Sequence, residues 1–238
     1  MKVNEIFRSI QGESSFSGLP CTMIRLTGCN LRCLYCDTPY AFYDGTDMTV
    51  EDALKEITRL TIGTRDEREE MNFKNSLPIT EPALSLSKGH SSLVEITGGE
   101  PLIQEDVYLL IKGLLNTGYR VLIETNGSLD IGRLDSRVVR IMDIKTPKSG
   151  MSGNMDFENI NKLGIKDEVK FVISDRDDYE WSKKVLGRYA IPCSILFSPA
   201  YGVLDPGILS DWILSDHLEV RLNLQLHKYI WGDKAVHR

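Results

Sequence analysis

The chain has 238 residues, of which 42% are hydrophobic, and its formal net charge is −6. This length allows one large α/β domain or two small ones, and the ordinary composition excludes wholesale disorder. The acidic balance argues against general nucleic-acid binding, which needs a basic surface. The start carries no signal-like apolar stretch, and the best apolar run, 107–115, is too short to cross a bilayer. We therefore expect a soluble, cytoplasmic protein without a membrane partner.

The first half of the chain begins with a predicted strand and helix. The apolar stretch 21–27 predicts a strand that ends at Gly28, and apolar residues at helical spacing predict a helix over 50–60. The segment 63–91 contains a charge run and a loop-like mixture of residues. We expect this segment to be a surface insertion without function.

Regular alternation of strands and helices follows. The patterns predict strands at 92–97, 120–124, 138–144, 168–174, 193–197 and 220–226, and helices at 104–116, 175–186 and 209–214. This order implies an α/β fold with a mostly parallel sheet of about six strands and outer helices. That count is short of eight, so we expect a single domain, 1–238, built as an incomplete TIM-like barrel. Polar motifs follow the predicted strands, where such folds carry their functional side chains.

Three cysteines, Cys29, Cys33 and Cys36, lie within eight residues. An odd number of neighbouring thiols cannot pair off as disulfides, and thiolates are the soft ligands that zinc and iron–sulfur clusters select. A four-iron cluster usually takes four cysteines, so three would leave one iron open to another ligand. A zinc ion held by the three cysteines and a histidine is the alternative. We interpret Cys21 and Cys193 as small buried hydrophobes.

The spacing Cys-x3-Cys-x2-Cys is the signature of radical S-adenosylmethionine enzymes, and Tyr35 matches the aromatic residue which that superfamily places beside the adenine. The block 98–101, Gly-Gly-Glu-Pro, resembles the motif that holds the methionine part of the cofactor. Residues without side chains let a ligand approach the backbone, and a carboxylate can accept from an ammonium group. By the same resemblance, Glu124 and Asn126 are candidates for the ribose hydroxyls.

Further blocks make the resemblance more specific, and they resemble the 7-carboxy-7-deazaguanine synthase family. The most specific are Glu5-Ile6-Phe7-x-Ser9-Ile10-Gln11-Gly12-Glu13 near the start and Gln225-x-His227-Lys228 near the end. Others lie at 24–31, 36–38, 98–102, 124–127, 143–147, 169–172 and 198–199. The matches run in order from residue 5 to residue 231 and leave out the segment 63–91.

The resemblance implies a carbon–nitrogen lyase in queuosine and 7-deazapurine biosynthesis. It would convert 6-carboxy-5,6,7,8-tetrahydropterin to 7-carboxy-7-deazaguanine with loss of ammonia. The implied cofactors are a [4Fe–4S] cluster on the three cysteines, S-adenosylmethionine, and Mg2+ at Thr38. The implied cofactor-binding residues are Tyr35, Asp37, Gly98, Gly99, Glu100, Glu124, Asn126, Thr146, Lys148, Ser198 and Pro199. The implied substrate-binding residues are Ile10, Gln11, Gly12, Glu13, Arg25, Thr97, Gln225 and His227.

Several points stay open in the sequence. Arg25 could fork onto the substrate carboxylate or form an ordinary ion pair, and Gln225 and His227 could instead be a hydrogen-bonded core pair. The resemblance implies a homodimer and an external one-electron donor, such as a flavodoxin-like protein, and it names no catalytic base. One alternative function is a radical activase that makes a glycyl radical on a partner protein. Another is a zinc-stabilised module without catalysis.

Overall fold

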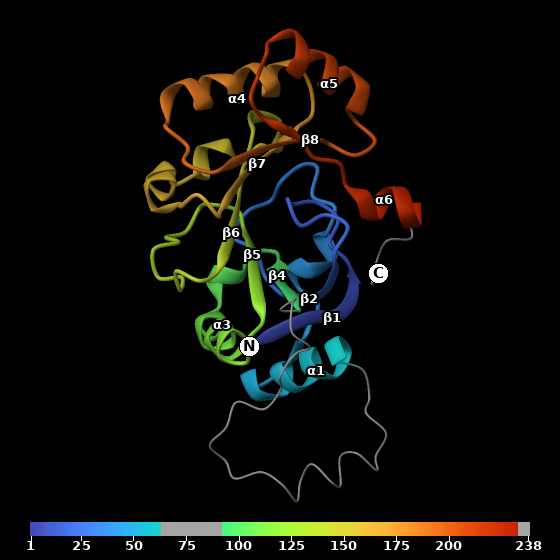
Figure 1. The fold of residues 1–238 in the computed structure, drawn as a ribbon, viewed down its shortest axis with the longest axis vertical. Helices are drawn as coiled ribbons and strands as arrows, with labels where there is room; N and C mark the ends of the chain where they lie inside the picture. Colours follow the sequence, from blue (N-terminus) through green and yellow to red (C-terminus); the bar gives the residue numbers. More distant parts are fainter. Residues whose placement is uncertain (63–91, 233–238) are drawn as a thin grey trace, which may run out of the picture.

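The computed structural model describes residues 1–62 and 92–232, so the insertion predicted at 63–91 lies outside the described residues. At its centre is one nine-stranded sheet in the order β3-β1-β2-β4-β5-β6-β7-β8-β9 (Figure 1). The strands from β2 to β9 run parallel, whereas β1 and β3 extend one edge in antiparallel fashion. The order ends at β3 and β9 without closing, which confirms the expected partial barrel.

The elements follow one another along the chain with these bounds. The strands are β1 (Lys2–Ile10), β2 (Pro20–Leu26), β3 (Thr46–Asp47), β4 (Leu93–Gly98), β5 (Arg120–Thr125), β6 (Val139–Ile144), β7 (Glu168–Ile173), β8 (Ser194–Pro199) and β9 (Arg221–Leu222). The helices are α1 (Val50–Ile62), α3 (Asp106–Asn116), α4 (Arg176–Arg188), α5 (Pro206–Ser215) and α6 (Leu226–Trp231). The short 3-10 helices are η1 (Pro39–Phe42), η2 (Pro101–Ile103), η3 (Pro147–Ser149), η4 (Ser152–Asn154) and η5 (Phe157–Lys162).

Two segments differ from the sequence prediction. The strand predicted over 220–226 was wrong beyond Leu222, because β9 has only two residues and α6 begins at Leu226. The nine-residue β1 has no predicted counterpart. Its pairing with β2 shifts register between Val3 and Glu5. Such a shift breaks the period-two pattern by which a strand is recognised in a sequence.

The two faces of the parallel strands have different surroundings. Residues such as Val94, Ile123 and Phe171 face outward and form the main core together with the helices. Residues one position away face inward, because successive side chains in a strand point to opposite faces. At the start of the strands this inner face holds a small apolar cluster that includes Leu93 and Leu122. Further along the strands it becomes polar, and the candidate site lies there.

The two remaining cysteines lie away from the cysteine loop. Cys21 is completely buried in the small inner cluster, as predicted. Cys193 is only half-buried, and it packs against the rim of the main core, so the expectation of a buried side chain holds in part. Within 1–62 and 92–232, none of the helices has the length and apolar character that crossing a bilayer requires.

Candidate active site

A cavity of about 480 Å³ lies at the carboxyl ends of the parallel strands. It is of the size that small-molecule sites have in other proteins. Most of the residues predicted for the site line it: Ile10, Gln11, Gly12, Glu13, Arg25, Cys29, Cys33, Tyr35, Cys36, Asp37, Thr38, Thr97, Gly98, Gly99, Glu124, Asn126, Ser198, Pro199, Gln225 and His227. Glu100, Thr146 and Lys148 are absent from this lining. Residues from both ends of the chain therefore meet at one cavity.

The cysteine loop lies against the glycine motif after β4. Gly98 has a φ of +144°, which side chains rarely tolerate. A Cβ atom on Gly99 would collide with the Gly28 carbonyl oxygen and lie 2.6 Å from Cys29 Cβ. The glycine pair therefore allows close contact between this turn and the cysteine loop, which is a structural reason for glycine beside the predicted cofactor site.

The geometry of the three cysteines fits a cluster better than a single zinc ion. A tetrahedral zinc with Zn–S distances of about 2.3 Å holds its sulfur ligands about 3.8 Å apart. Among the described residues, the three cysteine sulfurs do not form a set within 4.8 Å of one another. All three thiols are free and line the same cavity. A four-iron cluster is larger than one ion and keeps its ligands further apart, so these residues suit it.

Glu100 lies beneath the cavity and not in its lining. Its carboxylate is completely buried and accepts hydrogen bonds from the backbone amides of Leu102 and Asn126 and from the Thr125 hydroxyl. Burial raises the pKa of Glu100, and these donors counteract that rise. Glu100 thus holds the turns after β4 and β5 together, and its contact with a ligand ammonium group remains a prediction.

Two further cofactor-binding predictions lie outside the cavity. Lys148 is an exposed side chain whose ammonium group lies 2.9 Å from Asp175 on the outer surface. Thr146 is completely buried, and its hydroxyl donates to the Val172 carbonyl while lying 3.3 Å from the Tyr35 hydroxyl. Thr146 therefore supports Tyr35, which does line the cavity. The side chain of Lys148 points to another surface, so its predicted cofactor contact is not supported by the geometry.

Asn126 is tied to the cysteine loop. Its amide nitrogen donates to Asn30 Oδ1 at 3.0 Å, and its amide oxygen accepts from the backbone amide and hydroxyl of Ser128. The same nitrogen lies 3.9 Å from Cys29 Sγ. Since both ends of the amide have partners, Asn126 fixes the loop between β5 and β6 against the cysteines. Its contact with a ribose remains a prediction.

The predicted pterin residues form the other wall. Gln11 donates to Glu95 at 2.8 Å, and Gln225 donates to Glu13 at 2.8 Å. A Cβ atom on Gly12 would collide with the His227 ring, and the amide of Leu226 donates to the Gly12 carbonyl. The glycine thus allows α6 to dock on the loop after β1. This docking brings the two most specific sequence blocks into contact, although Glu13 and Gln225 are 212 residues apart in the chain.

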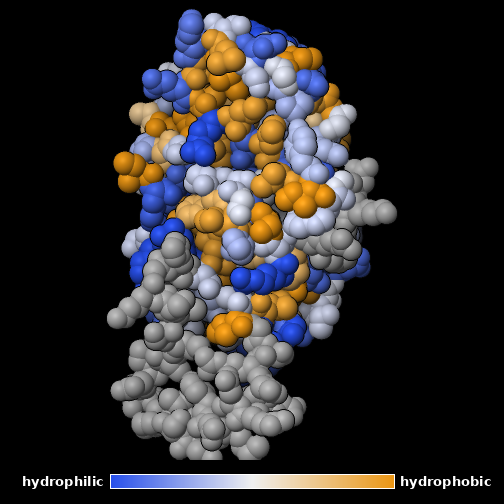
Figure 2. Space-filling model, turned by 45° about the vertical axis from the view of Figure 1, so that its right-hand side comes forward, coloured by the Kyte–Doolittle hydropathy of each residue, from blue (hydrophilic) through white to orange (hydrophobic). Residues whose placement is uncertain are grey.

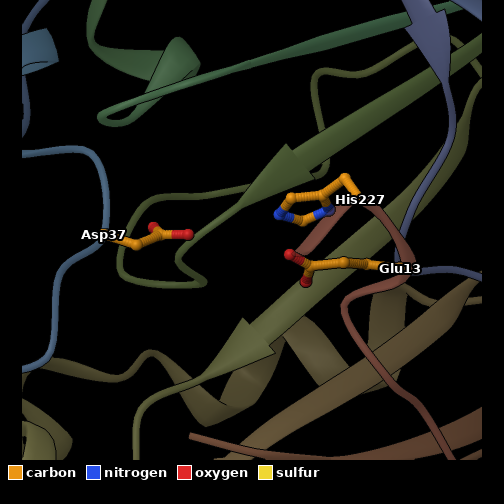
Figure 3. A group of neighbouring side chains, drawn as sticks. All are labelled: Glu13, Asp37 and His227. Atoms are coloured by element: carbon orange, nitrogen blue, oxygen red, sulfur yellow. The ribbon is translucent and has the colours of Figure 1, made fainter. Parts of the chain in front are cut away.

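Glu13, Asp37 and His227 point into the same space (Figure 3). One ligand atom from each of them lies within 4.8 Å of the others. They come from three segments: the loop after β1, the cysteine loop and α6. Glu13 already accepts from Lys170 and Gln225, so we interpret the group as a wall of the substrate site. Thr38 lines the cavity next to Asp37, with its hydroxyl 3.9 Å from Cys36 Sγ.

Arg25 lies on the inner face of β2 and lines the cavity, but it also has a protein partner. Its Nε donates to Glu5 Oε1 at 2.7 Å, and its guanidinium lies 5.9 Å from the centre of the Tyr40 ring. The ion pair that the sequence left open is therefore present. Because Arg25 also lines the cavity, it remains a candidate for binding a carboxylate of the substrate.

Four charged side chains that the sequence did not assign to the site also line the cavity: Glu95, Asp143, Lys145 and Lys170. Asp143, Lys145 and Lys170 lie in the blocks 143–147 and 169–172 of the family resemblance. Lys170 donates to Glu13 at 2.9 Å and to Glu124 at 3.1 Å, and Lys145 donates to Asp143 at 2.7 Å. A signal for them exists. Glu95, Asp143 and Lys170 are charged residues within β4, β6 and β7, and Lys145 follows β6 directly. Glu95 and Asp143 lie two positions after the inner-face residues Leu93 and Ile141, so the alternation along a strand places them on the same face.

Burial and close charges shift the proton affinities of these groups. Burial and the nearby Glu124 raise the pKa of Glu95 to about 8, so Glu95 is largely protonated at neutral pH. Burial alone would raise the pKa of Glu13, but Lys170, His227 and Gln225 together outweigh it and lower that pKa to about 2. Burial raises the pKa of the Cys29 and Cys33 thiols. The cavity thus holds a neutral and an ionised carboxyl side by side.

Comparison with known proteins identifies several close relatives, although no family model matches the chain. The chain is 39% identical to a 7-carboxy-7-deazaguanine synthase from Koribacter versatilis, over 97% of each chain. It is 39% identical to one from Chlorobaculum tepidum, over 99% of this chain and 96% of the relative. It is 40% identical to one from Methanospirillum hungatei, over 97% and 85%.

Solved structures agree on the fold. QueE from Escherichia coli matches with a TM-score of 0.64 at 21% identity, over 95% of this chain and 94% of that one. SuiB from Streptococcus suis, bound to its precursor peptide SuiA, matches with a TM-score of 0.52 at 14% identity. That match covers 85% of this chain and 47% of SuiB.

Proposed function

This chain belongs to the 7-carboxy-7-deazaguanine synthase family of radical S-adenosylmethionine enzymes, and from that premise we propose how its cavity performs the reaction. The enzyme is a carbon–nitrogen lyase of 7-deazapurine biosynthesis with a small-molecule substrate, and it uses a [4Fe–4S] cluster and S-adenosylmethionine. The substrate that we assign to the cavity is 6-carboxy-5,6,7,8-tetrahydropterin. The observation that carries this assignment is that the three cysteines and the predicted pterin residues line one cavity.

The cofactor side of the cavity is the cysteine loop and the turns after β4 and β5. Cys29, Cys33 and Cys36 would hold the cluster, while Gly98 and Gly99 leave room for the methionine part of S-adenosylmethionine against the backbone. When bound, these groups supply the radical chemistry that removes a hydrogen atom from the pterin. Tyr35, Asp37, Ser198 and Pro199 line the same region and would enclose the rest of the cofactor.

The substrate side is formed by the loop after β1, by β2 and by α6. A pterin is a flat ring edged with donors and acceptors, and the ionised Glu13 can accept from its N–H groups. The Arg25 guanidinium, held by Glu5, would bind the substrate carboxylate. Ile10, Gln11, Gly12, Thr97, Gln225 and His227 complete this wall. The protein contributes by positioning the substrate and by excluding water from the cavity.

We place Mg2+ at Thr38, beside Asp37. Both side chains line the cavity and offer oxygen ligands, which Mg2+ prefers. Thr38→Ala should lower activity, and excess Mg2+ should restore part of it because a weakened site fills by mass action. The measurement is the Mg2+ concentration that gives half-maximal rate. If this concentration is the same in the variant and the wild type, Thr38 is not a ligand.

Two partners complete the proposal. One is an external one-electron donor, which the bound cluster requires. The other is a second copy of the chain, since exposed apolar side chains near the cavity mouth and α6 include Tyr201, Val203, Tyr229 and Ile230. On this side of the molecule, apolar and polar residues are interspersed (Figure 2). Sedimentation analysis tests the homodimer. We also propose a reducing compartment, such as the cytoplasm, because the site requires free thiols.

The function is tested with anaerobically reconstituted protein. With reductant, Mg2+, S-adenosylmethionine and the pterin, it should produce 7-carboxy-7-deazaguanine and ammonia, detected by mass spectrometry. Absence of product from protein that carries a full cluster would contradict the substrate assignment. Substitution of Gln11, Glu13 and His227 separates this function from that of a radical activase, which needs no pterin pocket. Iron and sulfide in the purified protein, without zinc, exclude the zinc module.

A further inference from the structure

One buried lysine connects the two sides of the cavity. Lys170 lies in β7 with 6% of its surface exposed. Its ammonium group donates to Glu13 Oε2 at 2.9 Å and to Glu124 Oε1 at 3.1 Å, and Asp143 Oδ2 lies 3.8 Å away. Glu13 comes from the loop after β1 and Glu124 from β5, so Lys170 joins segments that are not neighbours in the sheet.

Each of the two carboxylates is fixed by Lys170 and by one neutral donor. The second oxygen of Glu13 accepts from Gln225 at 2.8 Å, and the second oxygen of Glu124 accepts from Thr97 at 3.0 Å. Burial alone would lower the pKa of Lys170, but Glu124 and Glu13 outweigh it and raise the pKa well above its ordinary value. If either carboxylate moved away, the buried Lys170 ammonium group would lose an ion-pair partner, which is unfavourable in free energy. The position of one carboxylate therefore depends on the other.

We propose that Lys170 is a positioning residue that couples the binding of the pterin to the binding of S-adenosylmethionine, so that each ligand tightens the other. This inference rests on the proposed function, which places Glu13 on the substrate side, and on the family resemblance, which implies that Glu124 binds the ribose of the cofactor. A ligand that orders Glu13 also orders Lys170 and Glu124. The second ligand then meets an ordered site and loses less conformational entropy on binding. By linkage, the coupling factor is the same in both directions.

The test measures affinities without turnover. Cluster-loaded enzyme is kept anaerobic and without reductant, and the Kd of each ligand is determined by equilibrium dialysis, alone and with the other ligand saturating. We expect each ligand to tighten the other at least about fivefold in the wild type. In Lys170→Met the coupling factor should fall below about twofold. This fall is separate from any weakening of the affinity that each ligand shows when it binds alone. Lys170→Arg keeps the charge and should retain part of the coupling.

Matched variants distinguish coupling from a loss of structure. Lys166→Met removes a lysine that precedes β7, donates to the Val138 carbonyl and does not line the cavity, and it should leave both affinities and the coupling factor unchanged. Glu124→Gln keeps the size of the side chain and removes its charge, so it should also reduce the coupling. If Lys170→Met does not fold, Glu124→Gln is used for the test in its place. Iron content and Tm verify the fold of each variant.

The possible outcomes distinguish failure of the inference from failure of the proposed function. If the wild type binds both ligands with affinities that do not depend on each other, the inference is wrong and the proposed function stands. If Lys170→Met or Glu124→Gln keeps the wild-type factor, coupling exists but Lys170 does not carry it, and the inference is again wrong. If cluster-loaded wild type does not bind the pterin at all, the proposed function is wrong and the inference falls with it.

Discussion

The outer and inner faces of the same parallel strands are both largely buried but chemically different. In β7, Phe171 faces outward into the main core with no exposed surface, while its neighbour Lys170 faces the cavity with 6% exposed. In β4, Ile96 and Glu95 form the same kind of pair. Alternation along one strand thus separates two tasks. The outer residues hold the sheet to its helices, and the inner residues present charges to a ligand.

The two faces also differ in energy. Burying a large apolar side chain contributes about 1.5–3 kcal/mol. A buried ion pair contributes little net free energy of folding, because removing the two charges from water costs about as much as their attraction provides. The inner network of Glu13, Glu124, Asp143 and Lys170 is therefore explained by function and not by stability. Substitutions on the two faces should separate these effects, and the following predictions are given from the largest effect to the smallest.

The largest effect is expected on the inner side, at the cysteine loop. Cys33→Ala should abolish cluster binding and all cleavage of S-adenosylmethionine, because a three-ligand site has no spare ligand. Cys29→Ala and Cys36→Ala should do the same. Iron content per chain and the yield of methionine are the measurements. Unchanged iron in the Cys33 variant would remove it from the ligand set.

Two other cysteines serve as controls for this comparison. Cys21→Ala empties a small space in the inner apolar cluster and should cost about 1 kcal/mol of unfolding free energy. Cys193→Ala should cost less, since that side chain is only half-buried. Both variants should keep the iron content of the wild type.

Phe171→Ala should disrupt the packing of the outer face against the helices. The ring is completely buried and lies 5.5 Å from the ring of Phe197, so its removal leaves a cavity in the main core. We expect a loss of about 3–5 kcal/mol in unfolding free energy, measured by urea denaturation. The fraction that remains folded should still load iron. A variant with wild-type stability would show that the core repacks freely around this site.

Arg25→Ala should weaken substrate binding without loss of the cluster. A charge-assisted contact to a carboxylate contributes about 1.5–3 kcal/mol, so kcat/KM for the pterin should fall roughly tenfold to a hundredfold. Slow, uncoupled cleavage of S-adenosylmethionine should persist. Glu5→Gln is the matched control, because it removes the partner of the ion pair and leaves the guanidinium in place. If Arg25→Ala instead loses iron, Arg25 supports the cysteine loop.

The smallest effect concerns the neutral carboxyl on the inner face. The pKa of Glu95 is about 8 in the folded chain against 4.5 in the unfolded one, so its contribution to stability is fully present below pH 4.5. This contribution is lost as pH rises through 8. Glu95→Gln replaces a protonated acid by a neutral amide of the same shape. We expect the Tm of the wild type to fall by about 3 °C or more relative to this variant between pH 6 and 9. Parallel Tm curves would mean that Glu95 is ionised throughout.

Much of the fold and site followed from the sequence alone. The cysteine spacing, the glycine pair after β4 and the alternation of strands and helices from 20 to 215 are local patterns, and local geometry preserves them in the structure. The blocks at both ends predicted that residues 10–13 and 225–227 belong to one site. The lining of the cavity agrees with this prediction. Contacts with cofactor and substrate remain predictions.

Tertiary structure decided what local patterns do not contain. The bulge in β1 and the helix α6 depend on pairing with distant segments, and the sequence pattern predicted neither. The resemblance implies that Glu100 and Lys148 bind the cofactor, and the structure shows the protein partners that they have without it, Leu102 and Asp175. Lys170 looks like one charge in an apolar strand until the fold sets Glu13 and Glu124 beside it. A sequence records which groups exist, but their partners, burial and proton affinities arise only when distant strands are brought together.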